Sequence, residues 1–268
     1  MDSIQAEQLT QVKLQLQSRQ TKAARVVEIG VDAWRLEIPA GSQGPYRLAQ
    51  LDDYTGKPRH AFPWKPPLRL SLRARASAAN IPGTWGFGLW NDPFGLAILR
   101  GVEILRLPTL PNTAWFFFAS PPNYLSLRDD LPAHGSLAAT FNSPRLPAPA
   151  LALGLPALPL LLLPPTARLL RGLGRRIVHQ DAVQMEIDVR DWHKFDLDWQ
   201  VERVTFRVDD EIRLQTNVVP QGPLGLALWV DNQFAAFSPD GRIRFGTLEN
   251  PEAAWVEIQD LQVESVLY

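Results

Sequence analysis

The sequence contains no cysteine, which excludes disulfide bonds, thiolate metal sites and cysteine nucleophiles. It also lacks an excess of charge of either sign, because 27 Lys and Arg residues balance 28 Asp and Glu residues. Nucleic-acid binding depends on clustered Lys and Arg that neutralise phosphates, so we expect no nucleic-acid partner. The N-terminal region has no apolar segment of the secretory type, and we therefore expect a cytoplasmic location.

Long uninterrupted apolar runs are missing as well, although a tract rich in Leu and Pro lies near the middle of the chain. A membrane-spanning helix needs about 20 apolar residues, and prolines interrupt every window of that length. Residues 166–177 instead predict a short amphipathic helix, with Leu169, Leu173 and Ile177 on one side and arginines around the other. Two interpretations stay open: residues 145–178 form an insertion packed over a sheet, or they contact an anionic membrane surface or a partner.

Aromatic residues and prolines are plentiful, with 9 Trp, 12 Phe and 24 Pro. Apolar and polar residues alternate over residues 193–199 and again over 204–209, with a short turn between them. Alternation with a period of two indicates β-strands with one buried and one solvated face. His193 falls on the buried face, where we expect a core imidazole bonded to a neighbour. The same alternation predicts strands at residues 25–38, 46–51, 68–77, 183–189, 212–216 and 225–232, and a closing edge strand at 259–267.

Several polar side chains fall on the solvated faces of these strands. Arg69, Arg73 and Arg75 alternate with apolar residues, and we expect this row to face water. Glu186 and Asp188 occupy the polar side of their strand, and we expect the same for them.

Residues 84–92 (TWGFGLWND) form a strand pattern of unusual composition. Trp85, Phe87 and Leu89 share one face, whereas two glycines and Trp90 share the other. Glycine within a strand often marks the close approach of a ligand or of another backbone, so this second face has room for something to lie against it. For Trp85, Phe117 and Trp199 we expect a place in the core between two sheets.

Residues 84–92 and 192–209 (WHKFDLDWQVERVTFRVD) resemble strands of the concanavalin A-like lectin and glucanase superfamily, in particular the laminarinase-like family 16 glycoside hydrolases. The resemblance implies a jelly-roll sandwich of two antiparallel sheets, one of them presenting a concave face. Residues 23–268 would form this single domain, preceded by a polar arm over residues 1–22. The family carries its catalytic carboxylates on a strand with the pattern E-x-D-x-x-E. Here residues 114–120 (AWFFFAS) occupy that place without any carboxylate, so we expect the catalytic machinery of the family to be absent.

The residues left for the concave face are aromatic and rich in amides. Tryptophan stacks on sugar rings while Asn, Asp and Gln bind hydroxyls, and an aromatic wall suits an apolar ligand equally well. On the strand at 114–120, either Trp115 or the side carrying Phe116 and Phe118 faces the ligand. We therefore expect a diverged, non-catalytic binding domain for a carbohydrate or another ring-bearing ligand. The candidate ligand-binding residues are Trp90, Asn91, Asp92, Trp115, Asn123, Tyr124, Trp229, Asp231, Asn232 and Gln233.

Two other functions stay open. A glycosidase-like enzyme would need two carboxyl groups about 5–9 Å apart, and Asp92, Asp130 and Asp231 are the candidates for rearranged catalytic acids. A peripheral membrane or assembly protein would act through residues 145–178 and hold an apolar molecule in its cleft.

The sequence favours no metal or cofactor. Asp129 and Asp130 together with Asp231 could offer oxygens to Ca²⁺, but no loop has the spacing of a calcium site. The histidines are too scattered for a zinc site, whose ligands usually come in closely spaced pairs. These are His60, His134, His179 and His193.

Overall fold

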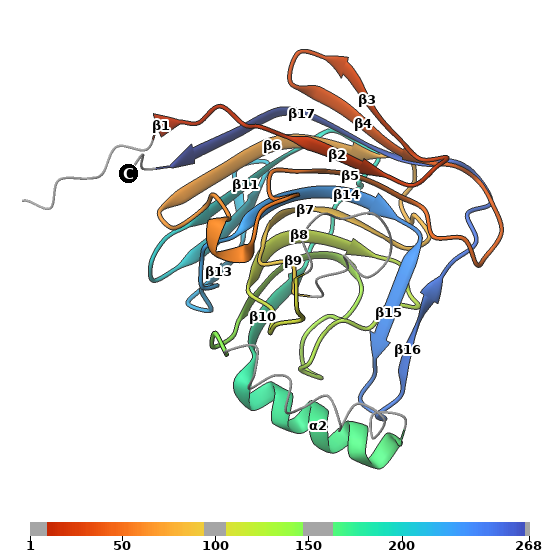
Figure 1. The fold of residues 1–268 in the computed structure, drawn as a ribbon, viewed down its shortest axis with the longest axis vertical. Helices are drawn as coiled ribbons and strands as arrows, with labels where there is room; N and C mark the ends of the chain where they lie inside the picture. The colour runs from red at the N-terminus through yellow and green to blue at the C-terminus, as the bar shows by residue number, and fades with distance from the viewer. Residues whose placement is uncertain (1–9, 94–105, 147–162, 266–268) are drawn as a thin grey trace, which may run out of the picture.

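The computed structural model describes residues 10–93, 106–146 and 163–265. They form two antiparallel sheets, of eight and seven strands, and a separate two-stranded ribbon (Figure 1). The main hydrophobic core lies between the two large sheets and takes side chains from both. The expected all-β sandwich of two antiparallel sheets is confirmed.

The eight-stranded sheet carries the strand pair expected at residues 193–209. Its central strand β17 pairs with β6 on one side and β4 on the other. The expectation of a closing edge strand at 259–267 is therefore wrong, because an alternating pattern identifies a strand but not its neighbours. The strands are, in spatial order, β13 (Glu211–Thr216), β12 (Val204–Val208), β11 (His193–Trp199), β6 (Leu68–Ala76), β17 (Ala254–Ser265), β4 (Ala33–Ile38) and β3 (Arg25–Gly30), with β1 (Thr10–Gln11) beside β17.

The seven-stranded sheet carries the tryptophan-rich strands. The sheet curves, and we call its face away from the eight-stranded sheet the concave face (Figure 1). The spatial order is β10 (His179–Gln184), β9 (Gly135–Asn142), β8 (Thr113–Ala119), β7 (Thr84–Trp90), β14 (Gly225–Asp231), β5 (Leu48–Asp52) and β2 (Gln17–Gln20). The ribbon consists of β15 (Gln233–Phe237) and β16 (Ile243–Thr247), and the helices are η1 (Arg59–Ala61) and α2 (Pro164–Ile177).

The N-terminal region is part of the sandwich from residue 10 onward. β1 pairs with β17 in one sheet, and β2 pairs with β5 in the other. The described portion of the expected polar arm therefore contributes one strand to each sheet; residues 1–9 lie outside the described part.

The alternation in β6 places its apolar residues inward and its arginines outward, as expected. Its leucines are buried between the sheets, while Arg69 and Arg73 are exposed and Arg75 is half-buried. Arg75 and Arg35 both bind Glu257 on this outer face. Burial would raise the pKa of Glu257, but the two guanidinium groups hold it below its usual value.

The strand expected at 183–189 ends early, at Gln184. Its alternation persists in the following extended segment, where Met185 and Val189 are buried and Glu186 and Asp188 are exposed. His193 differs from the expected core imidazole. Its ring bonds to the Asp209 carboxylate at 2.6 Å and remains partly exposed, because it stands at the first position of β11.

α2 confirms the helix expected at 166–177 and begins two residues earlier, with prolines in its first turn. Residues 147–162 of the expected insertion lie outside the described residues. Among the helices described, none has the length and apolarity to cross a membrane.

Candidate functional site

Three tryptophans from adjacent strands lie together on the concave face. Trp90 ends β7, Trp115 lies on β8 and Trp229 on β14. The ring centroids of Trp90 and Trp115 are 5.9 Å apart, and those of Trp115 and Trp229 are 5.6 Å apart. Each of the three side chains is half-buried, so part of each ring remains open to solvent.

The register of β8 decides which of its faces points outward. Phe116 and Phe118 belong to the core between the sheets. Trp115 and Phe117 therefore face the concave side, which resolves the alternative left open by the sequence. Six consecutive apolar residues carry no period of two, so the strand pairing, which places Trp115 opposite Gly88, fixes the face.

Phe117 corrects an expectation. Trp85 and Trp199 lie in the core as expected, but Phe117 lies on the concave face, 5.0 Å from Trp115 and 5.7 Å from Trp229 between ring centroids. We call Trp90, Trp115, Phe117 and Trp229 the aromatic floor.

The glycines of β7 make room for this floor. A Cβ atom at Gly86 would lie 2.9 Å from Cη2 of Trp229 and 2.3 Å from the Phe116 carbonyl oxygen. A Cβ atom at Gly88 would lie 2.6 Å from the Cβ atom of Trp115. The space that the sequence assigned to a ligand is thus filled by tryptophans of the neighbouring strands, and a ligand would lie on top of these rings.

A hydrogen-bonded chain joins the floor to a buried acid. The indole Nε1 of Trp229 donates to Oγ1 of Thr84 at 3.0 Å, and the Thr84 hydroxyl donates to Asp231 at 2.8 Å. The Tyr46 hydroxyl donates to the other carboxylate oxygen at 3.3 Å. Burial raises the pKa of Asp231 to about 7, although the bonds from Thr84 and from the Gln233 amide lower it.

The three candidate asparagines are buried and serve the scaffold. Each uses both its amide nitrogen and its amide oxygen within the protein, where they hold loops beside the strand ends. Such groups have little capacity left for ligand hydroxyls. Asn91 bonds to Leu110 and Asn112, Asn123 to Gly83, Ser120 and Ala235, and Asn232 to Pro45, Arg47 and Leu248.

The candidate catalytic acids do not converge. Asp92 lies beyond Trp90 at one end of β7, whereas Asp231 pairs with Thr84 at the other end. Thr84 and Trp90, the two ends of β7, are six positions apart, which at about 3.3 Å per residue is roughly 20 Å, and Asp92 lies beyond Trp90. Asp92 forms a buried ion pair with Arg106 at 2.7 Å.

The remaining candidates lie in surface segments. Asp130 is exposed and pairs with Arg128. Asp129 is already bound by arginines of α2. The guanidinium carbon of Arg171 lies over the ring of Tyr124, 5.5 Å from the ring centroid. Gln233 is half-buried at the start of β15. In the ranges that the structure describes, no three His, Asp or Glu side chains gather as metal ligands would.

Tyr54 packs beside the aromatic floor, and the sequence did not identify it as part of this site. Tyr54 is fully buried, with its ring 6.1 Å from Trp90 and 5.0 Å from Phe62. Gln50 donates to the Tyr54 hydroxyl at 3.2 Å. Burial, together with the nearby charge of Asp52, raises the pKa of the Tyr54 hydroxyl above its ordinary value. Tyr54 follows β5 in a polar cluster, and no local pattern marks it as a partner of β7.

No family model matches the chain, and no curated protein matches its sequence. The chain is similar to several solved structures. A family 16 endo-glucanase from Bacteroides ovatus has 10% identity and a TM-score of 0.48, with 94% of each chain covered. A laminarinase catalytic domain from Thermotoga maritima, bound to cetyltrimethylammonium bromide, has 12% identity and a TM-score of 0.47, covering 92% of this chain and 82% of that one. A legume lectin-like domain from Entamoeba histolytica has 8% identity and a TM-score of 0.45, covering 94% and 90%. The strand topology described above, rather than these distant likenesses, establishes the sandwich.

Proposed function

We propose that the chain is a non-catalytic binding domain whose aromatic floor takes a carbohydrate or another ring-bearing ligand. The observation that carries this proposal is the continuous row of half-buried rings from β7, β8 and β14. Rings fixed in this way can stack on the apolar face of a sugar or on an aromatic ligand at little cost in side-chain entropy. The buried amides beside the floor are already paired, so stacking rather than hydroxyl recognition supplies most of the affinity.

Two further observations support a binding role without catalysis. β8 presents Trp115 and Phe117 to the concave face, where a retaining glycosidase would need carboxylates about 5 Å apart. Asp231 is bonded to three protein groups and lies away from Asp92.

The test compares Trp115→Ala with Trp192→Ala, a matched control. Trp192 is also half-buried, but it lies against Arg73 and Arg75 on the outer face of the eight-stranded sheet. Calorimetric titration with β-linked gluco-oligosaccharides and with an uncharged aromatic probe, N-phenyl-1-naphthylamine, covers both ligand classes. Stacking on a Trp ring is worth roughly 1–2 kcal/mol, so Trp115→Ala should weaken binding about tenfold, and Trp192→Ala should leave it unchanged.

Binding of neither class to the wild-type chain, or equal loss in both variants, would refute the proposal. Release of reducing ends from an oligosaccharide, abolished by Asp231→Asn, would favour the enzyme instead.

A second candidate function rests on the orientation of α2. Its arginine side faces the protein: Arg171 is buried and bonds to Ser126, Leu127 and Asp129. Its apolar side faces outward instead. Leu169, Leu173 and Ile177 are 63%, 43% and 43% exposed.

This exposed stripe suits an anionic lipid surface. α2 contains no acidic residue, and the exposed Arg176 lies in its last turn beside the stripe, next to Arg175, which pairs with Asp129. Leucines that enter the headgroup region next to arginines are typical of interfacial helices. The ribbon turn lies against the same helix, where Arg168 donates to the Asp240 carbonyl oxygen at 2.8 Å (Figure 1).

Flotation with vesicles containing phosphatidylserine tests this second function. The pair Leu169→Gln and Leu173→Gln should remove the chain from the vesicle fraction. The control pair Leu107→Gln and Val201→Gln alters equally exposed apolar residues elsewhere and should not change flotation. Equal flotation of both double variants would end the membrane hypothesis.

A further inference from the structure

A pocket of about 480 Å³ opens at the side of the sandwich, apart from the aromatic floor. One wall is the segment 12–15, which crosses from β1 in one sheet to β2 in the other. The opposite wall is the segment from Asp53 to Lys65, and Ser265 at the end of β17 closes one side. The volume lies in the range of small-molecule sites, which is about 300–1,000 Å³.

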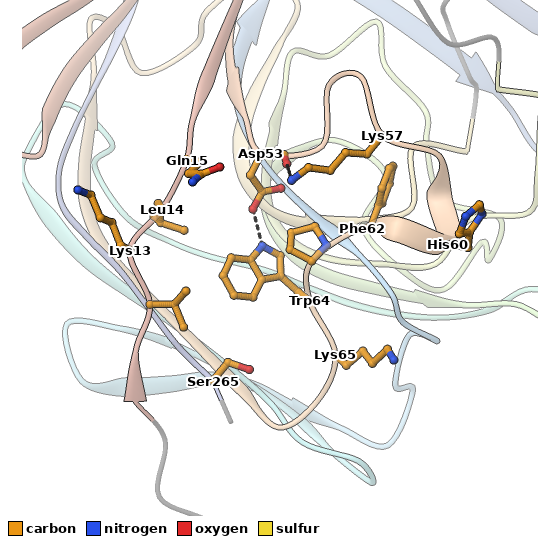
Figure 2. Close-up of a pocket in the computed structure, with 12 residues that line it drawn as sticks. Lys13, Leu14, Gln15, Asp53, Lys57, His60, Phe62, Trp64, Lys65 and Ser265 are labelled. Carbon is orange, nitrogen blue, oxygen red and sulfur yellow. Dashed lines mark hydrogen bonds between the residues drawn. The ribbon is translucent and has the colours of Figure 1, made fainter. Parts of the chain in front are cut away.

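The inner surface of this pocket is rigid and largely apolar. Leu14, Phe62 and Trp64 contribute to it. The indole of Trp64 donates to the Asp53 carboxylate at 2.5 Å (Figure 2). The backbone of Trp64 pairs with that of Leu224. The other carboxylate oxygen of Asp53 accepts the Leu226 amide at 2.9 Å. Asp53 is 3% exposed, so its charge is directed to the protein rather than to the opening.

The rim is basic. Lys13, Lys57 and Lys65 line the pocket together with His60, against the single acid Asp53. Lys57 donates to the Asp53 carbonyl oxygen at 2.7 Å, and Lys13 and Lys65 lie on either side of Trp64 (Figure 2). Within the described part of the chain, Lys194 is the only lysine that forms ion pairs. Among the described residues, two ammonium groups at this rim, those of Lys13 and Lys65, thus form no ion pair, on a chain whose net charge is only −1.

We propose that this pocket binds a small organic anion, in which an apolar body carries a carboxylate, sulfonate or phosphate group. The body would lie against Leu14 and Trp64, where burial of apolar surface favours it. The anionic group would remain at the rim between Lys13 and Lys65, whose flexible side chains can turn toward it. Neither part alone would suffice, because the rim charges are solvated and the inner surface is small.

The probe for the test is 8-anilino-1-naphthalenesulfonate, which combines an apolar body with one sulfonate. Its uncharged counterpart is N-phenyl-1-naphthylamine. In a fluorescence titration at low salt, the double variant Lys13→Gln and Lys65→Gln should bind the sulfonate roughly five- to tenfold more weakly, as expected for the loss of two solvent-screened charge contacts. The control variant, Lys22→Gln with Arg203→Gln, removes two exposed cations elsewhere and should bind as the wild type does.

Two more measurements locate the probe. Gln15→Trp places a large side chain at an exposed position of the pocket wall and should abolish binding. Trp115→Ala on the aromatic floor should leave sulfonate binding intact, so the pocket and the floor can fail independently. The proposal is overturned if the lysine double variant binds the sulfonate normally, if the uncharged probe binds Trp115→Ala, whose floor is disrupted, as tightly as the sulfonate does, or if only Trp115→Ala reduces sulfonate binding. The lysine substitutions are at exposed positions, and an unchanged thermal unfolding midpoint would show that the double variant is folded.

Discussion

The indole rings of Trp115 and Trp229 lie 5.6 Å apart with an angle of 48° between their planes. They come from β8 and β14, which do not pair with each other and flank β7. The contact is possible because β7 places glycines opposite both tryptophans: Gly86 pairs with Trp229, and Gly88 pairs with Trp115. The aromatic floor is therefore a product of three-strand pairing and exists only when this sheet is assembled.

We expect the two rings to be energetically coupled. Aromatic pairs in this geometry contribute about 0.5–1.5 kcal/mol beyond their buried area. In a double-mutant cycle of Trp115→Leu and Trp229→Leu, the double variant should lose less stability than the sum of the singles by that amount. Urea unfolding measures the free energy of unfolding of each single variant and of the double variant relative to the wild type. Strict additivity would show that the rings are neighbours without mutual stabilisation.

Gly86→Ala should destabilise the protein and disturb the floor. The new methyl group would collide with the Phe116 carbonyl oxygen at 2.3 Å, a backbone atom that cannot move alone. We expect a loss of about 1–3 kcal/mol in the free energy of unfolding. The control Gly172→Ala lies in α2 with open space around it and should instead stabilise by about 0.5–1 kcal/mol. Equal stability of Gly86→Ala and the wild type would contradict this packing.

Asp231 should make stability depend on pH. Its folded pKa of about 7 lies above the value of an exposed carboxyl, so the folded state binds the proton more tightly than the unfolded state. This contribution is fully present below about pH 4 and is lost as the pH rises toward 7, with a total on the order of 4 kcal/mol.

Asp231→Asn removes the titrating group while keeping an acceptor for Thr84. Its stability relative to the wild type should therefore increase between pH 4 and pH 8 in urea unfolding. Asp130→Asn, at an exposed ion pair, should not show this trend. Parallel pH profiles for Asp231→Asn and the wild type would rule out the raised pKa. Burial also raises the pKa of Asp53, to about 6, but that titration is common to all three proteins and cancels.

The buried pair of Asp92 and Arg106 supports one end of the site. Arg106→Met would leave Asp92 buried without a counter-charge, and we expect a cost of about 3–5 kcal/mol. Adding Asp92→Asn should recover part of this loss. Arg128→Met breaks an exposed pair and should cost less than about 1 kcal/mol. If Arg106→Met lowers the free energy of unfolding as little as Arg128→Met does, Asp92 does not form a buried ion pair with Arg106.

Alternation predicted many of the strands and their buried sides, although it gave no strand for β9, β15 or β16. The leucines of β6 and the Trp85, Phe87 and Leu89 side of β7 lie inward as expected, since period two assigns a side once one face is polar or small. It failed for β8, where both faces are apolar and only the partner strands decide.

The polar candidates failed for a different reason. Asn91, Asn123 and Asn232 are buried by loops distant in the sequence, and a buried amide must bond to whatever backbone lies there. The orientation of α2 was equally hidden, because periodicity separates its leucines from its arginines without saying which side meets the protein. The side carrying Arg171 meets the protein because Arg171 bonds there to Asp129 and to the Leu127 carbonyl oxygen.

The central place of β17 also bears on how the chain acquires its fold during synthesis. Without residues 254–265, the eight-stranded sheet consists of two separate pieces, β13-β12-β11-β6 on one side and the β3–β4 hairpin on the other. The edge of β6 that would pair with β17 then exposes unpaired backbone N–H and C=O groups, which are a template for pairing with other chains. Translation must run nearly to residue 265 before that edge can close, so a ribosome-bound chain would depend on a chaperone or on rapid completion to avoid aggregation.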